Sequence, residues 1–369
     1  MPLVLLLAFF LGWFAVLLGS WLLFSRRRAP QGGPLPGPPP RVSILIAARN
    51  EEAAIGRCLQ SVRALDYPPE CLEVLLGDDA STDQTAAVAQ AAMQGFAGSF
   101  RILSITDTLG SARGKANVLA HLARAASTDV FLITDADISL PASWVRGLVG
   151  HLRPGLGTVT GLTLVAGPRL FDRLQGLDWL MSLALVQMVS DRGQPVTAMG
   201  NNMLITRDAY EAVGGYESLP FSVTEDYELF RAVLAKGFGW LNLFEPAVLA
   251  ESLPVATWRG LLHQRRRWLR GVEGLPWHIQ LGLIYYAGYY PALLLAAGLW
   301  GGAAVLGILA AKMLAQGLLA GSAYRKVGRR APLHLLPLFE LYTLAVTAGL
   351  TGFRFSRRPF EWKGRRYSR

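Results

Sequence analysis

The stretch that decides the fold runs from Val130 to Ile138 and reads VFLITDADI. Its first five residues are mostly apolar, which is typical of a strand buried on both faces of a sheet. Asp135 and Asp137 follow at the carboxyl end of that strand, and ligands of open α/β sheets bind at this edge. Two carboxylates so close together favour a divalent cation with a phosphate-bearing ligand between them. An Asp-rich turn after a strand is the competing interpretation.

The segments around this strand alternate between strand and helix patterns. Strands are expected at residues 42–48, 72–76, 100–105 and 130–134, and helices at residues 51–62, 83–93 and 114–126. A spacing near thirty residues per strand–helix repeat is what βαβ units require. The sequence therefore predicts an α/β fold with a mostly parallel sheet, in a soluble domain that covers residues 42–255.

The two ends of the chain are apolar. The 369 residues are 52% hydrophobic and only 17% charged. Residues 1–25 carry no charged side chain and are long enough to cross a hydrocarbon core of ~30 Å as a helix. Positive charges follow this run instead of preceding it, which favours a retained anchor over a cleaved signal peptide. The basic and Pro/Gly-rich linker 26–41 then places the next domain in the cytoplasm by the positive-inside rule.

The C-terminal region 281–353 is expected to hold further membrane segments. Leu281 to Ala311 is free of charge and, with Met313 to Tyr324, forms either two spans or one long tilted span followed by an interfacial helix. Two C-terminal spans are our preferred interpretation. Lys312 indicates a boundary between segments or a snorkelling side chain.

The last apolar piece, Leu335 to Phe353, lies between two basic clusters and contains Pro337 and Glu340. If both clusters are cytoplasmic, this piece cannot cross the membrane once, so it is re-entrant or interfacial. Residues 354–369 are then a basic cytoplasmic tail. The sequence thus predicts a multi-pass protein of the cell (inner) membrane with a cytoplasmic catalytic domain.

Polar side chains also follow the other predicted strands. Asp78 and Asp79 end the second strand, and adjacent acids repel unless donor groups, such as those of a base or a ribose, bind them. Lys115 closes the segment GSARGK at a helix start, a setting able to hold phosphate oxygens although it does not match a P-loop. Asn201 and Asn202 precede a later short strand.

Two further segments carry candidate residues. Glu225 and Asp226 begin a helix, where the helix dipole alone favours acids, so Asp226 becomes a functional candidate if it faces the same cavity as the D-x-D pair. Residues 256–280 contain a basic, aromatic helix with the sequence QRRRW at 264–268. This helix could lie on anionic lipid head groups. Its arginines would also suit a pyrophosphate leaving group.

Four motifs in this order resemble those of the membrane-bound family 2 glycosyltransferases. That group includes ceramide glucosyltransferase and the catalytic cores of cellulose, hyaluronan and poly-N-acetylglucosamine synthases. The resemblance covers residues 42–271 and the flanking membrane segments, and it rests on Asp78-Asp79, Asp135 with Asp137, Thr224 to Asp226, and Gln264 to Trp268. It implies a GT-A fold, the Rossmann-like sheet of nucleotide-diphospho-sugar transferases, with flanking transmembrane helices.

The resemblance also implies how a nucleotide sugar is held. Asp78 and Asp79 would contact its nucleoside, and Lys115 its base or diphosphate. Asp135 would contact the ribose and diphosphate. Together with Asp137 it would also bind a Mg²⁺ or Mn²⁺ ion.

For the chemical step, the resemblance implies that Asp226 is the general base, with Glu225 assisting its position. The residues expected beside the diphosphate and the acceptor are Gln264, Arg265, Arg267, Trp268, Asn201 and Asn202. Positive charge there would stabilise the departing diphosphate. A single in-line displacement then inverts the anomeric centre, and no second carboxylate nucleophile is required.

These roles imply an inverting hexosyltransferase that moves a sugar, which we take to come from a UDP-hexose, to a hydroxyl or carboxyl of a membrane lipid-type acceptor. The ending FEWKGRRY at 360–367 resembles the tail of bacterial lipid and carotenoid glucosyltransferases in this group. A processive polysaccharide synthase is the alternative, although its channel generally takes more spans. An inactive, membrane-anchored nucleotide-binding partner and a nucleotidyltransferase are alternatives of other classes.

Other features exclude some functions. Cys58 and Cys71 are expected to be thiols without a disulfide in a cytoplasmic domain. The five histidines have no ligand spacing, which argues against a zinc site. Much of the net charge of +10 lies beside membrane segments, so anionic lipid is a nearer explanation for it than nucleic acid, which we do not expect as a partner.

Overall fold

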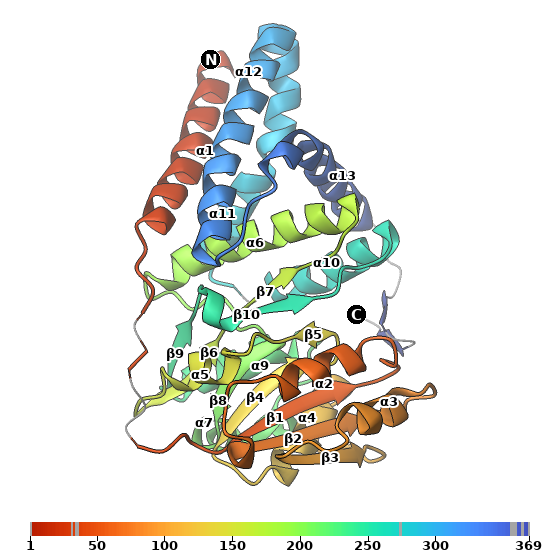
Figure 1. Cartoon of the computed structure of the whole chain (residues 1–369). Coiled ribbons are helices and arrows are strands. Elements are labelled where there is room, and N and C mark those ends of the chain that lie inside the picture. Colours follow the sequence, from red (N-terminus) through yellow and green to blue (C-terminus); the bar gives the residue numbers. More distant parts are fainter. Residues whose placement is uncertain are drawn as a thin grey trace. The chain divides into compact units, whose positions relative to one another are not determined.

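The computed structural model describes residues 2–30, 32–33, 37–272, 275–354, 360–362 and 365–367. The chain divides into two compact units, which are taken separately here. The sheet unit comprises residues 29–166 and 193–253, and the helical unit comprises residues 1–28, 167–192 and 254–369. Figure 1 labels the elements of both.

A seven-stranded sheet forms the centre of the sheet unit. Its strands are β1 (Val42–Ala48), β2 (Leu72–Asp78), β3 (Ser99–Ser104), β4 (Val130–Asp135), β6 (Leu156–Thr160), β8 (Asn202–Thr206) and β9 (Gly239–Asn242), in the order β3-β2-β1-β4-β8-β6-β9. The first four in this order are parallel, and β8 runs antiparallel to both of its neighbours. The expected α/β fold with a mostly parallel sheet is confirmed.

Helices cover this sheet because their apolar residues recur at helical spacing. In α2 (Ile55–Arg63), the buried residues Ile55, Cys58, Leu59 and Val62 form one face. The other α-helices of the unit are α3 (Thr85–Ala92), α4 (Lys115–Ala125), α5 (Trp144–Val149), α7 (Arg207–Ala212), α8 (Gly215–Ser218) and α9 (Glu225–Ala235), and two short 3₁₀ turns span Pro69–Cys71 and Pro246–Val248. A smaller sheet has the order β5-β10-β7, with β5 (Ile138–Ser139), β7 (Leu162–Val165) and β10 (Leu249–Ser252).

The strand register places the polar residues of the sheet at two opposite edges. Ala48 pairs with Asp78, and Ala47 pairs with Asp135, so the residues after β1, β2 and β4 share the carboxyl edge. Thr134 pairs with Asn202, which brings the residues before the antiparallel strand β8 to the same edge. The topology therefore collects at one edge the segments in which the sequence placed its candidate residues.

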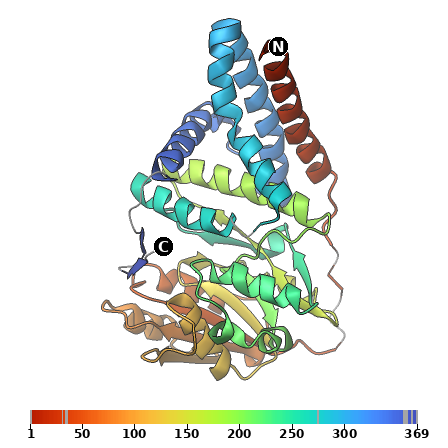
Figure 2. The same ribbon diagram turned by 180° about the vertical axis from the view of Figure 1, so that it is seen from behind.

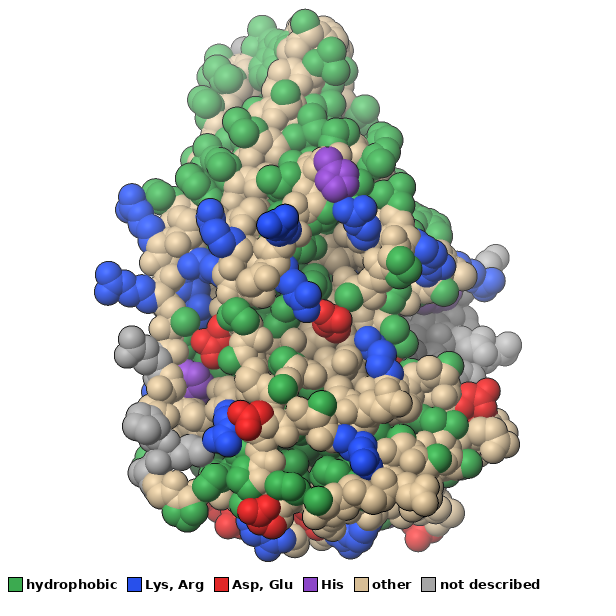
Figure 3. Space-filling model, in the orientation of Figure 1, with side chains coloured by type: hydrophobic (Ala, Val, Ile, Leu, Met, Phe, Trp, Pro, Cys, Tyr) green, Lys and Arg blue, Asp and Glu red, His purple; other side chains and the backbone are tan. Residues whose placement is uncertain are grey.

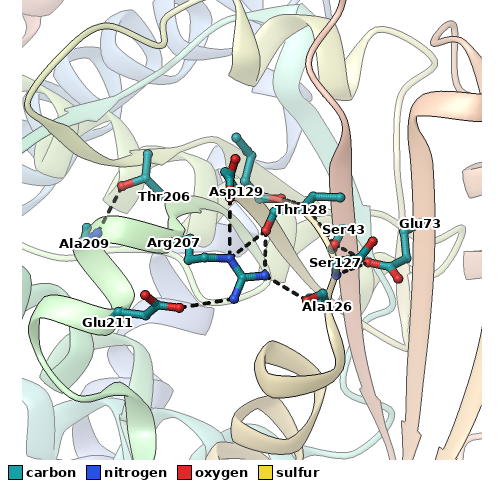
Figure 4. Close-up of polar contacts among 11 residues, drawn as sticks. Ser43, Glu73, Ala126, Ser127, Thr128, Asp129, Thr206, Arg207, Ala209 and Glu211 are labelled. Carbon is teal, nitrogen blue, oxygen red and sulfur yellow. Dashed lines mark hydrogen bonds and ion pairs between the residues drawn. The ribbon is translucent and has the colours of Figure 1, made fainter.

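The opposite, amino edge carries a network of satisfied polar groups, drawn in Figure 4. The buried carboxylate of Glu73 accepts hydrogen bonds from Ser43 Oγ at 2.5 Å and from the Ser127 N–H at 2.8 Å, and Arg101 Nη2 lies 3.0 Å from it. Arg207 donates to the carbonyl oxygens of two residues before β4, Ala126 and Thr128. Each group at this edge thus has a partner within the protein.

The helical unit consists mainly of α-helices, most of them apolar. They are α1 (Pro2–Ser25), α6 (Leu170–Ser190), α10 (Trp258–Val272), α11 (Trp277–Ala287), α12 (Tyr289–Lys326) and α13 (Leu336–Arg354), with a 3₁₀ turn at Leu333–Leu335 and two short paired strands, β11 (Phe360–Trp362) and β12 (Arg365–Tyr367). Within the described residues, three helical segments are long and apolar enough to cross a membrane: Leu3–Ser25, Trp277–Lys326 and Leu333–Gly352. Figure 2, which views the molecule from behind, shows α1 beside α12, as Figure 1 does. Hydrophobic side chains cover these helices, and Lys and Arg side chains gather at one end of them (Figure 3).

The segment Trp277–Lys326 folds back on itself. The hydroxyl of Tyr289 donates to the carbonyl oxygen of Ile308 at 3.4 Å. The same nineteen residues would span about 28 Å in a straight helix. The reversal lies at Gly301, whose φ of +79° favours glycine. The region therefore consists of two helical legs joined at Gly301, and the number of membrane spans remains a prediction.

Lys312 marks no boundary between segments and does not snorkel, contrary to the sequence prediction. It lies inside the second leg of the hairpin and is only 3% exposed, because its ammonium group pairs with Glu340 of α13 at 2.6 Å. Tyr290 of the first leg accepts a further hydrogen bond from it at 3.0 Å. A charge in an apolar helix is costly unless it is paired. Lys312 and Glu340, the two charged residues in these apolar stretches, therefore neutralise each other.

Candidate active site

Lys115 holds a group of carboxylates together at the carboxyl edge. Its Nζ lies 2.5 Å from Asp135 Oδ1, at the end of β4, and 3.4 Å from Glu225 Oε1, in the first turn of α9. Burial alone would lower the pKa of Lys115, but Asp135, Glu225 and Asp226 outweigh that effect and raise it. The lysine therefore stays protonated, and three acids from distant parts of the sequence share one cation.

Asp226 is fixed by the backbone. Its Oδ2 accepts a hydrogen bond from the Gly200 N–H at 2.9 Å, and its Oδ1 accepts one from the Tyr227 N–H at 2.8 Å. A Cβ at position 200 would lie 2.6 Å from the Cβ of Asp226, so only glycine allows this close approach. Two donors on two different oxygens set the plane of the carboxylate and leave lone pairs on each oxygen for another partner.

Asp78 and Asp79 belong to a pair of interlocked loops after β1 and β2. Asp78 Oδ1 accepts from the Ser81 N–H at 3.1 Å, and Arg49 Nη1 lies 2.6 Å from the Asp79 carbonyl oxygen and 3.6 Å from its carboxylate. Each loop contains a non-glycine residue with positive φ, Asn50 at 52° and Ala80 at 51°. Such conformations cost energy and cluster at ligand sites, which makes these loops candidates for contact with a nucleoside.

Asp137 lies two residues beyond Asp135, and helix α2 anchors the backbone of both. Arg57 Nη2 donates to the carbonyl oxygens of Asp137 at 2.6 Å and Glu251 at 3.1 Å. The thiol of Cys58 donates to the carbonyl oxygen of Asp135 at 3.5 Å. Burial, followed by the charges of Asp137 and Asp135, raises the pKa of Cys58, so it remains a thiol and a donor. Both cysteines are free.

The residues at this edge fit a metal that shares its ligands with a nucleotide. No group of three or more His, Cys, Asp or Glu side chains that could hold a metal occurs among the described residues. Asp135 and Asp137 provide two carboxylates, and Mg²⁺ typically binds one or two carboxylates together with substrate phosphates. The donor set therefore suits Mg²⁺ or Mn²⁺ held jointly by Asp137, Asp135 and a diphosphate.

The two asparagines before β8 differ from each other. The side chain of Asn202 is fully buried. It accepts from Trp144 Nε1 and donates to the carbonyl oxygens of Leu162 and Val248, each at 2.8 Å. These bonds give Asn202 a packing role and leave it no donor for a substrate. Asn201, next to the glycine that holds Asp226, has a buried Oδ1 with no hydrogen-bond partner, so it stays a candidate.

The QRRRW segment lies on α10 of the helical unit, and two of its residues face α6. Arg265 Nη2 pairs with Asp178 Oδ2 at 2.6 Å, and its guanidinium lies 5.3 Å from the ring centre of Trp179 and 4.5 Å from that of Trp268. Those two rings are themselves 4.5 Å apart. Arg265 and Trp268 therefore pack α10 onto α6. Gln264 lies one turn before Trp268 on this helix, and the roles of Gln264 and Arg267 at the diphosphate and the acceptor remain predictions.

Sequence reasoning missed four residues near this edge: Arg49, Arg57, Gly200 and Tyr216. Arg49 directly follows the first predicted strand, and that position was the available signal for it. Nothing in the pattern identifies Arg57, because its role is a contact with carbonyl oxygens of residues about 80 and 194 positions away. The phenol of Tyr216 is buried. Burial, followed by the charge of Glu225, raises its pKa well above the usual value.

Comparison with protein families gives a match along nearly the whole chain. The model described as Glycosyl transferase family 21 matches residues 4–368. Among curated proteins, the chain is 29% identical over 237 residues to the Beta-monoglucosyldiacylglycerol synthase of Synechocystis sp., an alignment that covers 63% of this chain and 48% of that protein. It is 25% identical over 371 residues to the 4,4'-diaponeurosporenoate glycosyltransferase of Staphylococcus aureus, covering 94% and 93%. The chain thus spans about half the length of the first of these relatives and most of the second.

Among solved structures, the chain is similar to the mannosyltransferase PcManGT of Pyrobaculum calidifontis, described in complex with GDP-Man and Mn²⁺. The TM-score is 0.57 at 21% identity, and the match covers 94% of this chain and 99% of that one. At this identity the likeness speaks for the fold alone. It confirms the expected GT-A fold.

Proposed function

The chain belongs to glycosyl transferase family 21, and from this membership we propose that it transfers a hexose from a nucleoside-diphosphate sugar to a lipid-type acceptor with inversion. The expectation from its motifs, a membrane-type glycosyltransferase with a GT-A fold, is confirmed. The sequence motifs resemble those of family 2, and the family model that matches the chain is that of family 21.

The observation that carries the proposal is the excess of acid at the carboxyl edge. Asp135, Glu225 and Asp226 surround the single ammonium group of Lys115, so the cluster keeps a net negative charge. Acids gathered around one cation in this way are stabilised by a further cation or by donor groups of a ligand. A metal-bound sugar nucleotide provides both, through its metal and through the hydroxyl groups of its sugar.

Asp226 has the geometry of a general base. Its carboxylate is oriented by the N–H groups of Gly200 and Tyr227, and each oxygen keeps a lone pair that can accept the proton of an acceptor hydroxyl. As that proton leaves, the acceptor oxygen attacks the anomeric carbon, and the bond from that carbon to the diphosphate breaks. Glu225, adjacent in the chain and paired with Lys115, keeps this turn of α9 in place.

Charge on the leaving diphosphate needs compensation at the same edge. The ammonium of Lys115 is available for it because the lysine stays protonated. Mg²⁺ or Mn²⁺ held by Asp137 and Asp135 would supply Lewis-acid stabilisation of the diphosphate when bound. Asp78 and Asp79 would hold the nucleoside. Gln264 and Arg267 of the QRRRW segment remain our proposed contacts to the diphosphate and the acceptor.

A lipid-type acceptor is supported by two lines of argument. The curated relatives are named for transfer to diacylglycerol and to diaponeurosporenoate. Three segments within the described part of the chain are apolar and long enough to cross a membrane, so an acceptor dissolved in the bilayer would be near at hand. We propose a multi-pass membrane protein with the sheet unit in the cytoplasm, as Arg26, Arg27 and Arg28 after α1 favour.

The experiment is a transfer assay on membranes that contain the protein, supplied with radiolabelled sugar nucleotides. Label that enters the organic phase on extraction, and that disappears with Asp226→Asn, is the expected result. Label found only in high-molecular-weight polysaccharide would contradict the lipid acceptor and favour the polymer synthase. Mass spectrometry of lipids from cells with and without the gene then identifies the acceptor by a hexose mass difference on one lipid class.

A further inference from the structure

Helix α8 lies close behind the acid cluster, in the chain segment that leads to Glu225. It begins at two glycines with positive φ, Gly214 at 75° and Gly215 at 65°. Its next residue, Tyr216, is buried, and the charge of Glu225 is the largest charge contribution to its raised pKa. The N–H of Tyr216 donates to the hydroxyl of Tyr210 at 3.2 Å, which fixes α8 to α7.

Glu217, the following residue of α8, holds the loop in front of α4 through its backbone. The N–H of Ser111 donates to the Glu217 carbonyl oxygen at 2.9 Å, and the Ser111 hydroxyl donates to the same oxygen at 3.0 Å and to the carbonyl oxygen of Leu219. Gly110 has a φ of +50°, and a Cβ there would collide with the Glu217 carbonyl oxygen. The two loops therefore meet backbone to backbone.

The side chain of Glu217 holds the other end of the same helix. Its Oε1 pairs with Arg124 Nε at 3.0 Å, in the last turn of α4, and its Oε2 accepts from Tyr210 at 3.4 Å. Lys115 is the first residue of α4. Glu217 thus contacts the loop that precedes Lys115 and the end of the helix that Lys115 begins.

We propose that Glu217 and Ser111 are positioning residues that set the contact of Lys115 with Glu225. We call the contacts among Gly110, Ser111, Glu217 and Arg124 the clasp. The clasp connects helix α4, which begins at Lys115, to the segment that carries Glu225. The two groups are 3.4 Å apart in the structure, and loosening the clasp would let them separate. This inference rests on the proposed function, because it gives the pair Lys115–Glu225 a role in the transfer step.

A role in stability alone does not account for the clasp. Arg124 is 59% exposed while Glu217 is 17% exposed, and an ion pair open to water on one side contributes modestly to the free energy of unfolding. Ser111 is also exposed, so water can satisfy the groups that its substitution frees. A displacement of about 1 Å at a reacting centre, in contrast, can lower the rate by about a hundredfold. The clasp is therefore expected to affect the rate much more than the fold.

The test compares Ser111→Ala with Ser111→Thr, which keeps the hydroxyl, and with Glu211→Gln, a control that removes a similarly exposed ion pair of α7. Ser111→Ala is expected to lower kcat for sugar transfer about tenfold to a hundredfold. The Kd of the nucleoside diphosphate should change less than about twofold, and the melting temperature by no more than in the control. Ser111→Thr should restore most of kcat, and Glu211→Gln should leave it unchanged.

A second readout follows Lys115 itself. In protein labelled with ¹⁵N-lysine, the ammonium resonance of Lys115, assigned with Lys115→Arg, should be protected from exchange in the wild type and lost in Ser111→Ala. An unchanged kcat in Ser111→Ala, or a loss that Ser111→Thr does not repair, would overturn the clasp. A fall in kcat accompanied by a fall in melting temperature larger than that of the Glu211→Gln control would also overturn it. A wild type that transfers no sugar would instead overturn the proposed function, while the lysine resonance would still report on the clasp.

Discussion

The two edges of the central sheet use acidic side chains in opposite ways. At the amino edge, Glu73 alone receives donors from Ser43, Ser127 and Arg101, so donors outnumber acids. At the carboxyl edge, three acids share Lys115 as their common cation. Glu73 is buried, whereas the three acids of the carboxyl edge are half-buried, and all four belong to the same unit. The first arrangement is complete without a ligand, whereas the second has more negative charge than its cation neutralises.

This difference separates residues that hold the fold from residues that, in the proposed function, act on a substrate. A carboxylate with a full set of donors stabilises the native state, and burial without compensation destabilises it. A cluster of acids around one cation is typical of a functional site. The difference can be tested with substitutions at either edge, because each edge predicts its own effect on stability and on the rate of transfer.

The largest effect is expected from Asp226→Asn. The amide oxygen of asparagine can still accept from the Gly200 N–H, so the fold remains, but the proton acceptor is lost. We expect kcat to fall by about 10² to 10⁴. The Kd of the donor and the melting temperature should change little, as isothermal titration and thermal unfolding would show. A variant with wild-type kcat would remove Asp226 from the role of base.

Glu73→Ala should show the reverse pattern. It leaves the Ser127 N–H without its acceptor and removes one of the two acceptors of the Arg101 guanidinium, which costs about 3 kcal/mol of unfolding free energy. For a unit of this size that corresponds to a melting temperature lower by about 6 to 12 °C. The rate per folded molecule at low temperature should match the wild type. If Glu73→Ala lowered kcat as much as Asp226→Asn does and left the melting temperature unchanged, the proposed difference between the two edges would be wrong.

Gly200→Ala sharpens the comparison within the carboxyl edge. The added methyl group must displace the side chain of Asp226, since it would lie 2.6 Å from its Cβ. We expect kcat to fall by about tenfold to a hundredfold, because the base moves relative to the acceptor. The Kd of the nucleoside diphosphate should stay within about twofold. Weakened nucleotide binding with normal kcat would instead place Gly200 beside the nucleotide.

The smallest effect concerns pH. Burial by itself would raise the pKa of Glu73, but hydrogen bonds from Ser127 and Ser43 and the charge of Arg101 lower it below the ordinary value of 4.5. Glu73 therefore stabilises the fold above about pH 4.5, and this contribution is lost as the pH falls through its lowered pKa. The difference in melting temperature between wild type and Glu73→Gln should be positive at pH 7 and shrink below pH 4.5. A difference that grows on acidification would reverse this sign.

Much of the sheet could be predicted from sequence because its strands are buried on both faces. The apolar runs at 42–48 and 130–134 are each matched by a strand, and the topology of parallel strands brings their ends together. That is why Asp135 could be proposed at a ligand-binding edge before any geometry was known, whereas Lys115 and Glu225 were assigned to the same site through the family resemblance. The acids stand out because an apolar strand makes the polar residues after it conspicuous.

Other features could not be predicted because they depend on contacts between distant segments. Asn202 looked like a ligand-binding residue, but Trp144 and two carbonyl oxygens take up its amide. Lys312 looked like a boundary, but its partner Glu340 lies on another helix. Residues 167–192 were counted within the soluble domain, yet α6 packs with the apolar helices of the helical unit. Sequence spacing carries no information about such pairings.

The central claim is that one carboxylate at the carboxyl edge, Asp226, activates the acceptor for a single displacement. The measurement that tests it most directly is the anomeric configuration of the first product, read by proton NMR from the glycosylated lipid and compared with that of the donor sugar. The account predicts inversion. Retention would require a second nucleophile and an intermediate for which this account has no residue, and it would contradict the claim.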